Sequence, residues 1–179
     1  MHQIFDHLRY SHDALPGYQL AELPFTASDL SMVLVLPTSD DKGIVTSSEV
    51  LTALAKLQTT RVALALPKFK FKSKYEDNLK EALQAIGVIS PFFGDLCGLY
   101  GYCGPFSDKV IQKTVIDVNE KGVEAAAVTA IMVLESAGPS EDPILMMLDH
   151  PFQFFIYDHT EDLVIFEGRL GAQEIPEGD

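Results

Sequence analysis

The chain has few basic residues and no long apolar run. It carries 13 Lys and Arg against 26 Asp and Glu, which gives a formal net charge of −13 at pH 7. An acidic protein repels phosphate backbones and anionic lipid surfaces. No apolar run approaches the ~20 residues that span a bilayer, and residues 1–6 have neither the basic nor the apolar region of a signal peptide. We therefore expect neither nucleic acid nor a membrane among its partners.

Motifs for catalysis and for metal binding are missing as well. The five histidines, at positions 2, 7, 12, 150 and 159, form no His-Glu-x-x-His motif and no ligand pair on one helix face. The sequence has no Gly-x-Ser-x-Gly turn and no phosphate-binding Gly-rich loop. It predicts a protein that is not an enzyme and that needs no cofactor or metal. We interpret His150 and His159, which flank an expected strand, as polar turn residues.

Cysteine is scarce. Cys97 and Cys103 lie in the segment GDLCGLYGYCGPF, where the intervening Gly and Tyr residues would let them form a bridge. One small loop does not define a disulfide scaffold, and no histidine lies near enough to complete a metal site. We expect free thiols, with a local disulfide as the alternative. The chain has no Asn-x-Ser/Thr sequon, so glycosylation does not indicate its compartment.

The apolar patterns that are present predict mostly β-structure. With 179 residues and 47% apolar content the chain can form one domain with a core. Residues 31–36 are continuously apolar, which is typical of a strand buried on both faces. No segment resembles a linker, so we expect one mixed unit. Strands are expected at residues 4–10, 17–25, 31–36, 61–66, 68–72, 109–119, 152–158 and 163–170, and helices at 47–57 and 78–86, with a Gly- and aromatic-rich connection at 90–108.

A basic stripe runs along one of these strands. Lys68, Lys70 and Lys72 alternate with Phe69 and Phe71, which predicts a half-buried strand with a basic outer face. We interpret the lysines as a solvated face. Polyanion binding there is the less favoured alternative, because the rest of the chain is acidic.

The most informative segment is EKGVEAAAVTA at residues 120–130. It follows the strand-like run at 110–118 and precedes residues 134–150, which contain no Lys or Arg. High helix propensity makes a helix one reading of this segment. Between residues 122 and 134 the only charge is Glu124, and strand alternation leaves the opposite face uncharged. The segment can therefore be an exposed loop or a strand inserted without burying a charge. The uncharged face comprises Val123, Ala125, Ala127, Thr129, Ile131 and Val133.

The order of motifs resembles the serpin family. The run VIQKTVIDVNEKGVEAAAVTA, a variable loop, and then DHPFQFFIYDHTEDLVIFEGRL is similar to the C-terminal signature of serpins. Upstream, YQLAELPFTASDLSMVLVLP and RVALALPKFKFKSKYEDNLKEALQAIGV resemble two further serpin stretches, so the likeness covers nearly all of residues 17–170. The resemblance implies the C-terminal half of a multidomain-type α+β serpin fold. That half has a mostly antiparallel or mixed sheet, two or three short helices and an exposed reactive loop.

The resemblance also implies a function and its residues. Residues 1–179 would be a single partial serpin domain with a reactive loop at about 120–149, and the chain would inhibit serine endopeptidases by suicide-substrate loop insertion. The scissile bond is expected at Ser136–Ala137, with Leu134 and Glu135 as alternatives. The implied hinge residues are Glu120, Gly122, Val123, Glu124, Ala125, Ala126, Ala127 and Thr129.

The expected partner is a target protease with an apolar pocket. No Lys or Arg occurs between Gly122 and Pro151, so a pocket built around a buried carboxylate finds no cation. This favours chymotrypsin-, elastase- or subtilisin-like serine proteases, or a cysteine protease with an apolar pocket. The second expected partner is the missing N-terminal half of the fold, without which residues 109–119 form an exposed sheet edge. The alternatives are a non-inhibitory serpin or a binding module with chaperone-like action. The family implies an extracellular location, with the cytoplasm as the alternative.

Overall fold

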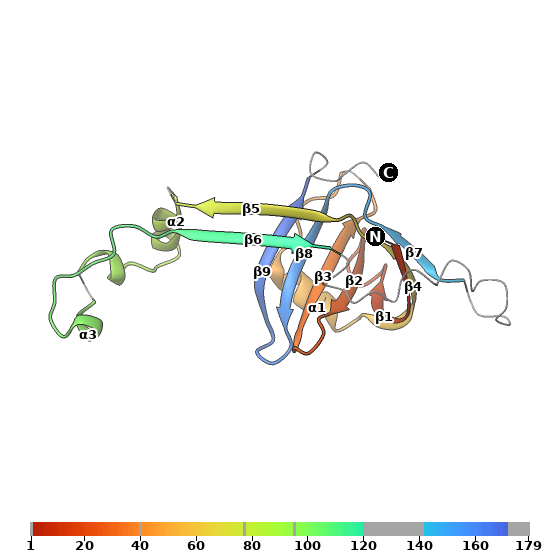
Figure 1. Cartoon of the computed structure of the whole chain (residues 1–179), viewed down its shortest axis with the longest axis horizontal. Helices are drawn as coiled ribbons and strands as arrows, with labels where there is room; N and C mark the ends of the chain where they lie inside the picture. Colours follow the sequence, from red (N-terminus) through yellow and green to blue (C-terminus); the bar gives the residue numbers. More distant parts are fainter. Residues whose placement is uncertain (1, 40, 77, 95, 120–141, 172–179) are drawn as a thin grey trace. The chain divides into compact units, whose positions relative to one another are not determined.

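A computed structural model describes residues 2–39, 41–76, 78–94, 96–119 and 142–171 (Figure 1). The chain divides into two compact units, Met1–Phe69 with Val118–Asp179, and Lys70–Asp117. Strands predominate and the helices are short, so the α+β class expected from the sequence is confirmed. That residues 1–179 form a single partial domain stays a prediction. The strands are β1 (His2–Ser11), β2 (Tyr18–Pro24), β3 (Leu30–Pro37), β4 (Gln58–Ala65), β5 (Phe69–Tyr75), β6 (Gln112–Val118), β7 (Ile144–Met147), β8 (Phe152–Asp158) and β9 (Leu163–Leu170).

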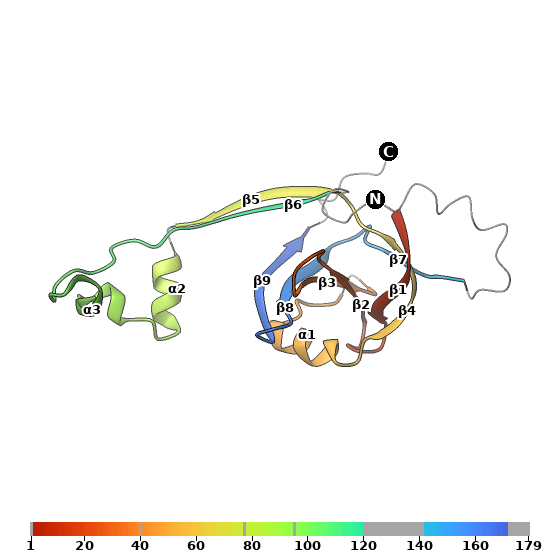
Figure 2. The same ribbon diagram turned by 60° about the horizontal axis from the view of Figure 1, so that its bottom comes forward.

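The larger unit is built on a seven-stranded sheet in the order β7-β4-β1-β2-β3-β8-β9. All neighbours are antiparallel except β4 and β7, which run parallel. Seen in Figure 2, the strands follow an arc, and helix α1 (Ser47–Leu54) lies against one face of it. The central strand β3 is buried from Ser31 to Leu36, as its continuous apolar run predicts.

The core forms because alternate side chains of the central strands point to opposite faces of the sheet. On the face covered by α1, Val33, Val35 and Phe155 pack with Val50 and Leu54 of the helix. On the opposite face, Phe154 stacks with Phe166 at a ring-centroid distance of 6.1 Å, and Phe69 lies 5.6 Å from Phe154. The apolar residues of the motif FQFF therefore serve both layers of the core.

Helix α1 is held at each end by a polar contact. Its N-cap is Thr46, which forms a capping box with Glu49. Hydrogen bonds from the backbone and side chain of Thr46 lower the pKa of the Glu49 carboxyl. At the C-terminal end, Arg9 Nη2 donates to the carbonyl oxygen of Leu54 at 2.6 Å. A cation there is favourable because the helix dipole is negative at that end.

The smaller unit contains most of β5 and β6 together with three short helices. The two strands form a two-stranded sheet and run in opposite directions in Figure 1. The expected helix near residues 78–86 is α2 (Leu79–Ala85), and Gly87 beyond its end has a φ of +94°, as in a left-handed cap. The expected connection at 90–108 also contains helical turns, namely η1 (Ser90–Phe92) and α3 (Cys97–Tyr100).

Candidate functional site

Strand β6 leads directly into the candidate hinge. Its residues alternate in exposure, with Thr114, Ile116 and Val118 half-buried and Val115 exposed. Within the described ranges, β5 is the only strand that pairs with it. That residues 109–119 form an exposed sheet edge without the N-terminal half of the fold stays a prediction.

The predicted hinge and reactive bond lie outside the described residues. The structure therefore does not test the assignments made from the sequence at those positions, and they stay predictions. The residues concerned are Glu120, Gly122, Val123, Glu124, Ala125, Ala126, Ala127, Thr129, Leu134, Glu135, Ser136 and Ala137.

Strand β7 lies within residues that the sequence analysis placed in the loop at about 120–149. Residues 144–147 pair in parallel with β4, in a register that opposes Val62 to Ile144 and Ala65 to Met147. Met146 is fully buried, and the amide of Leu148 donates to the carbonyl oxygen of Ala65 at 2.9 Å. The sequence did not reveal this strand because only four residues pair and Pro143 directly precedes them. It anchors the chain on the C-terminal side of the predicted reactive bond.

The basic stripe on β5 is partly neutralised. Lys70 forms an ion pair with Asp117 of β6, and Lys74 and Lys109 both pair with Glu76. Hydrogen bonds from Lys109 and Lys74 lower the pKa of the Glu76 carboxyl to about 2. These ion pairs neutralise positive charge that would attract a polyanion. They therefore favour the interpretation of Lys68, Lys70 and Lys72 as a solvated face.

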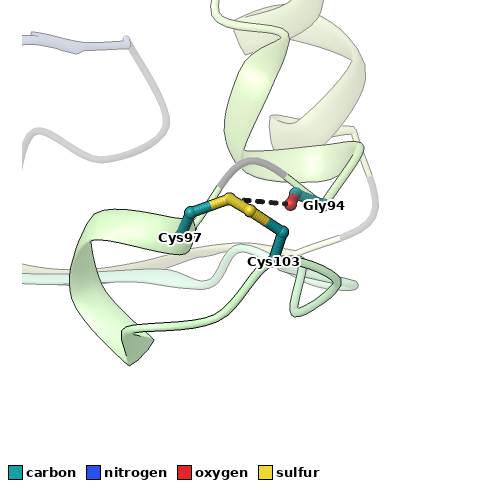
Figure 3. Close-up of a disulfide and its surroundings, with 3 residues drawn as sticks. All are labelled: Gly94, Cys97 and Cys103. Carbon is teal, nitrogen blue, oxygen red and sulfur yellow. Dashed lines mark hydrogen bonds between the residues drawn. A yellow bond between two sulfur atoms is a disulfide. The ribbon is translucent and has the colours of Figure 1, made fainter.

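The two cysteines are joined. Cys97 and Cys103 form a disulfide with a Cα–Cα distance of 4.4 Å, so the expectation of free thiols is wrong and the alternative is correct. Cys97 begins α3, and Gly101 ends it with a φ of +75°. This left-handed turn reverses the chain and brings the cysteines together. Figure 3 shows the bridge beside Gly94, whose carbonyl oxygen lies 3.9 Å from the sulfur of Cys97.

A buried carboxylate, unnoticed in the sequence, forms the centre of a polar cluster on the α1 face of the larger sheet. Glu22 is only 3% exposed and faces Arg9 across β1 and β2, with Arg9 Nη1 2.5 Å from Glu22 Oε2. Glu22 Oε1 accepts a hydrogen bond from Ser31 Oγ at 2.8 Å and lies 2.8 Å from His159 Nε2. Glu22 and Ser31 are both buried, so the hydrogen bond between them satisfies polar groups inside the fold.

The two histidines beside β8 occupy structural positions, as their turn assignment predicts. His150 precedes β8, and its Nε2 lies 2.8 Å from the carbonyl oxygen of Pro37 at the end of β3. His159 follows β8 in the turn to β9 and contacts Glu22. The residues described hold no group of three His, Cys, Asp or Glu side chains placed to bind a metal. No helix among them is long and apolar enough to cross a membrane.

Comparison with known proteins identifies the class. The family model described as Serpin (serine protease inhibitor) matches residues 1–171. Iripin-3 from Ixodes ricinus is 40% identical over 161 residues, and Serpin B4 from Homo sapiens is 36% identical over 164 residues. The chain belongs to the serpin family, as the resemblance of its motifs indicates.

The fold and the extent of the match agree with a partial serpin. The native crystal structure of the thermophilic serpin tengpin aligns with a TM-score of 0.68 and 23% identity, over 95% of this chain and 45% of that one. The matches to Iripin-3 and Serpin B4 each cover 86% of this chain but only 40% and 41% of those proteins. The chain thus spans less than half the length of the relatives it matches.

Proposed function

We propose that this chain carries the reactive half of an inhibitory serpin, which traps a serine protease by suicide-substrate loop insertion. The observation that carries the proposal is a sequence pattern: the alternate positions from Val123 to Val133, which follow β6 in the chain, carry no charge. Membership in the serpin family supports it. A loop that inserts beside a strand gains main-chain hydrogen bonds, and small side chains let it do so without steric or electrostatic cost.

The loop composition supports a protease with an apolar specificity pocket. Residues 122–151 carry no Lys or Arg, and the predicted reactive bond lies at Ser136–Ala137, with Leu134 and Glu135 as alternatives. A trypsin-like pocket contains a buried carboxylate that this loop leaves unpaired. The proposal therefore names chymotrypsin-, elastase- or subtilisin-like enzymes, or a cysteine protease with an apolar pocket.

The test is incubation with chymotrypsin and with elastase, followed by a denaturing gel and mass spectrometry of the products. We expect a covalent adduct in which the protease serine is esterified to the new C-terminus formed by cleavage between Leu134 and Ala137. Its mass should be the sum of the two proteins less the C-terminal fragment that this cleavage releases. Trypsin is the control and should give no adduct. Cleavage in the loop without an adduct, both for the chain alone and with the N-terminal part supplied as described below, would show that the loop of this chain is only a substrate.

A matched pair of variants tests the insertion step separately. Ala125→Arg places a charge on the face predicted to turn inward, whereas Ala126→Arg places the same charge on the other face. The first should reduce the adduct yield by about tenfold or more, because an unpaired buried charge costs several kcal/mol. The second should keep most of the yield. Equal losses from the two variants would contradict the face assignment.

The proposal includes a partner that supplies the first half of the fold. The chain spans about 40% of the length of Iripin-3. Among the described residues β6 pairs with β5 alone, so its other edge is where a further strand can pair. The test is co-purification with the part of Iripin-3 outside the matched residues, with and without the protease. If an adduct forms only in the presence of that part, the receiving sheet needs the partner.

A binding module without inhibitory action is the second candidate. Many large apolar side chains of the unit Lys70–Asp117 are exposed, which is typical of an interaction surface. This function predicts stable complexes with other proteins and no adduct with any protease. The gel experiment therefore separates the two candidates.

For the compartment, we propose the extracellular space. The disulfide of Cys97 and Cys103 supports an oxidising environment. The cytoplasmic alternative has support from a relative named Intracellular coagulation inhibitor 1 from Tachypleus tridentatus, 33% identical to this chain. Alkylation of the protein isolated from its natural source, followed by mass spectrometry, distinguishes them, because only free thiols gain mass.

A further inference from the structure

The disulfide closes a ring that displays apolar side chains to solvent. Between the two cysteines, Leu99 is 77% exposed, Tyr100 is 54% exposed and Tyr102 is 65% exposed. The two tyrosine rings pack edge to face at a centroid distance of 6.3 Å. Proteolytic nicking concentrates at exposed loop tips, and a protease with an apolar specificity pocket cleaves after large apolar residues.

If the chain acts as proposed above, its target protease can also cleave within this ring. A protease attracted to an apolar residue in the reactive loop would find three more such residues at positions 99–102. Cleavage there would cut the connection between β5 and β6, the strand that leads into the hinge. We propose that the Cys97–Cys103 disulfide protects this loop from the apolar-specific proteases that the reactive loop engages. The inference rests on the proposed function.

The physical basis is the distance between the ends of the ring. A protease binds its substrate in an extended conformation, and six residue steps of extended chain span about 20 Å. The disulfide holds the Cα atoms of Cys97 and Cys103 at 4.4 Å. The intact bond therefore opposes the extension that the residues between them need to enter an active-site cleft.

The rest of the structure holds the ring only weakly. Helix α3 has no buried residue. Among the described residues, the amides of Leu99 and Tyr100 donate to Leu96, that of Gly101 donates to Cys97, and that of Gly104 donates to Gly94 at 3.3 Å. Such a segment opens readily, because exposed hydrogen bonds and few apolar contacts give little local stability. The disulfide therefore adds a covalent constraint to a loop with little other local stability.

The size of the effect follows from loop closure. Cross-linking a loop of about seven residues lowers the population of open conformers by a factor of about 50. Proteolysis in the fast-opening regime follows that population. Removing the bond should therefore raise the rate of cleavage inside the ring by about 50-fold.

The experiment compares the full chain with the variant Cys97→Ser/Cys103→Ser during limited digestion with chymotrypsin. Peptide mapping gives the rate of cleavage after Leu99, Tyr100 and Tyr102 relative to that after Phe106. Phe106 is 57% exposed and lies outside the ring, so it serves as the internal reference. We expect this ratio to rise about 50-fold in the variant. Because it is internal, the ratio is informative even if the variant is less stable overall.

A second measurement opens the ring without changing the sequence. Dithiothreitol reduces the S–S bond to two cysteine thiols and is itself oxidised to its cyclic disulfide, and the thiols are then alkylated. The reduced chain should show the same rise in the ratio. A ratio that changes less than about threefold in both experiments would overturn the proposal, as would two titratable thiols in the native protein.

The cleavage ratio from the digestion is measured independently of the adduct experiment. Cleavage between Leu134 and Ala137 appears on different peptides from cleavage in the ring. A missing adduct with a raised ratio would overturn the inhibitory function but leave the protection of the loop intact. An adduct with an unchanged ratio would do the reverse.

Discussion

Replacing Glu22 with glutamine should destabilise the larger unit by about 2–3 kcal/mol. The carboxylate is 3% exposed and contacts Arg9, Ser31 and His159 at 2.5, 2.8 and 2.8 Å. Glutamine has nearly the same volume, so the change removes the charge without creating a cavity. Its amide keeps one acceptor oxygen, but its NH₂ group faces side chains that act as donors in the native cluster.

The magnitude follows from the burial of each partner. Breaking a fully buried ion pair costs about 3–5 kcal/mol, because one charge is left uncompensated. Here the side chains of Arg9 and His159 are 39% and 40% exposed, so water can solvate them after the change and the cost is smaller. Ser31 is fully buried and cannot reach water, so its hydroxyl contributes the rest of the loss.

The assay is urea unfolding followed by circular dichroism, since the chain has no tryptophan. For a slope of about 2 kcal/mol per molar urea, the midpoint should fall by about 1–1.5 M. Glu161→Gln is the matched control, because this glutamate is exposed in the turn beside His159, and it should change stability by less than about 0.5 kcal/mol. If the loss of unfolding free energy for Glu22→Gln is no larger than that for the control, the cluster does not stabilise the sheet and our reasoning is refuted.

Two further predictions concern packing and pH. Gly168→Ala should cost about 1–3 kcal/mol, because the added Cβ would lie 2.4 Å from Cζ of the buried Phe154 ring; Gly43→Ala, with nothing within 4 Å, is the control for thermal unfolding. A hydrogen bond to Asp162, with burial, raises the pKa of Tyr157 to about 12. This contribution to stability is fully present below pH ~10 and is lost as the pH rises through about 12. The difference between the ultraviolet titration curves of the wild type and of Tyr157→Phe should have its midpoint near pH 12. A midpoint near pH 10 would contradict the contact.

Much of the fold could be predicted because its signals are local. The apolar run of β3 predicts a strand buried on both faces, and the structure confirms it. Gly87 marks the end of α2 for a similar reason, since a left-handed residue there favours glycine. The order of motifs from residue 17 to residue 170 indicates the family, which the family model confirms. The hinge at 120–129 and the reactive bond at 134–137 remain predictions from sequence.

The sequence by itself determined the family, the order of most strands, and the acidic charge that disfavours nucleic acid and anionic lipid. These properties depend on the types of residues and on patterns among residues that are close in the sequence. Only the tertiary structure decided that β7 is a strand, because its four residues are stabilised by pairing with β4. It also decided that Glu22 is paired, since the partners of that carboxylate come from β1, β3 and the turn after β8. The disulfide depended on the left-handed turn at Gly101, which brings two cysteines together where spacing alone left both states open.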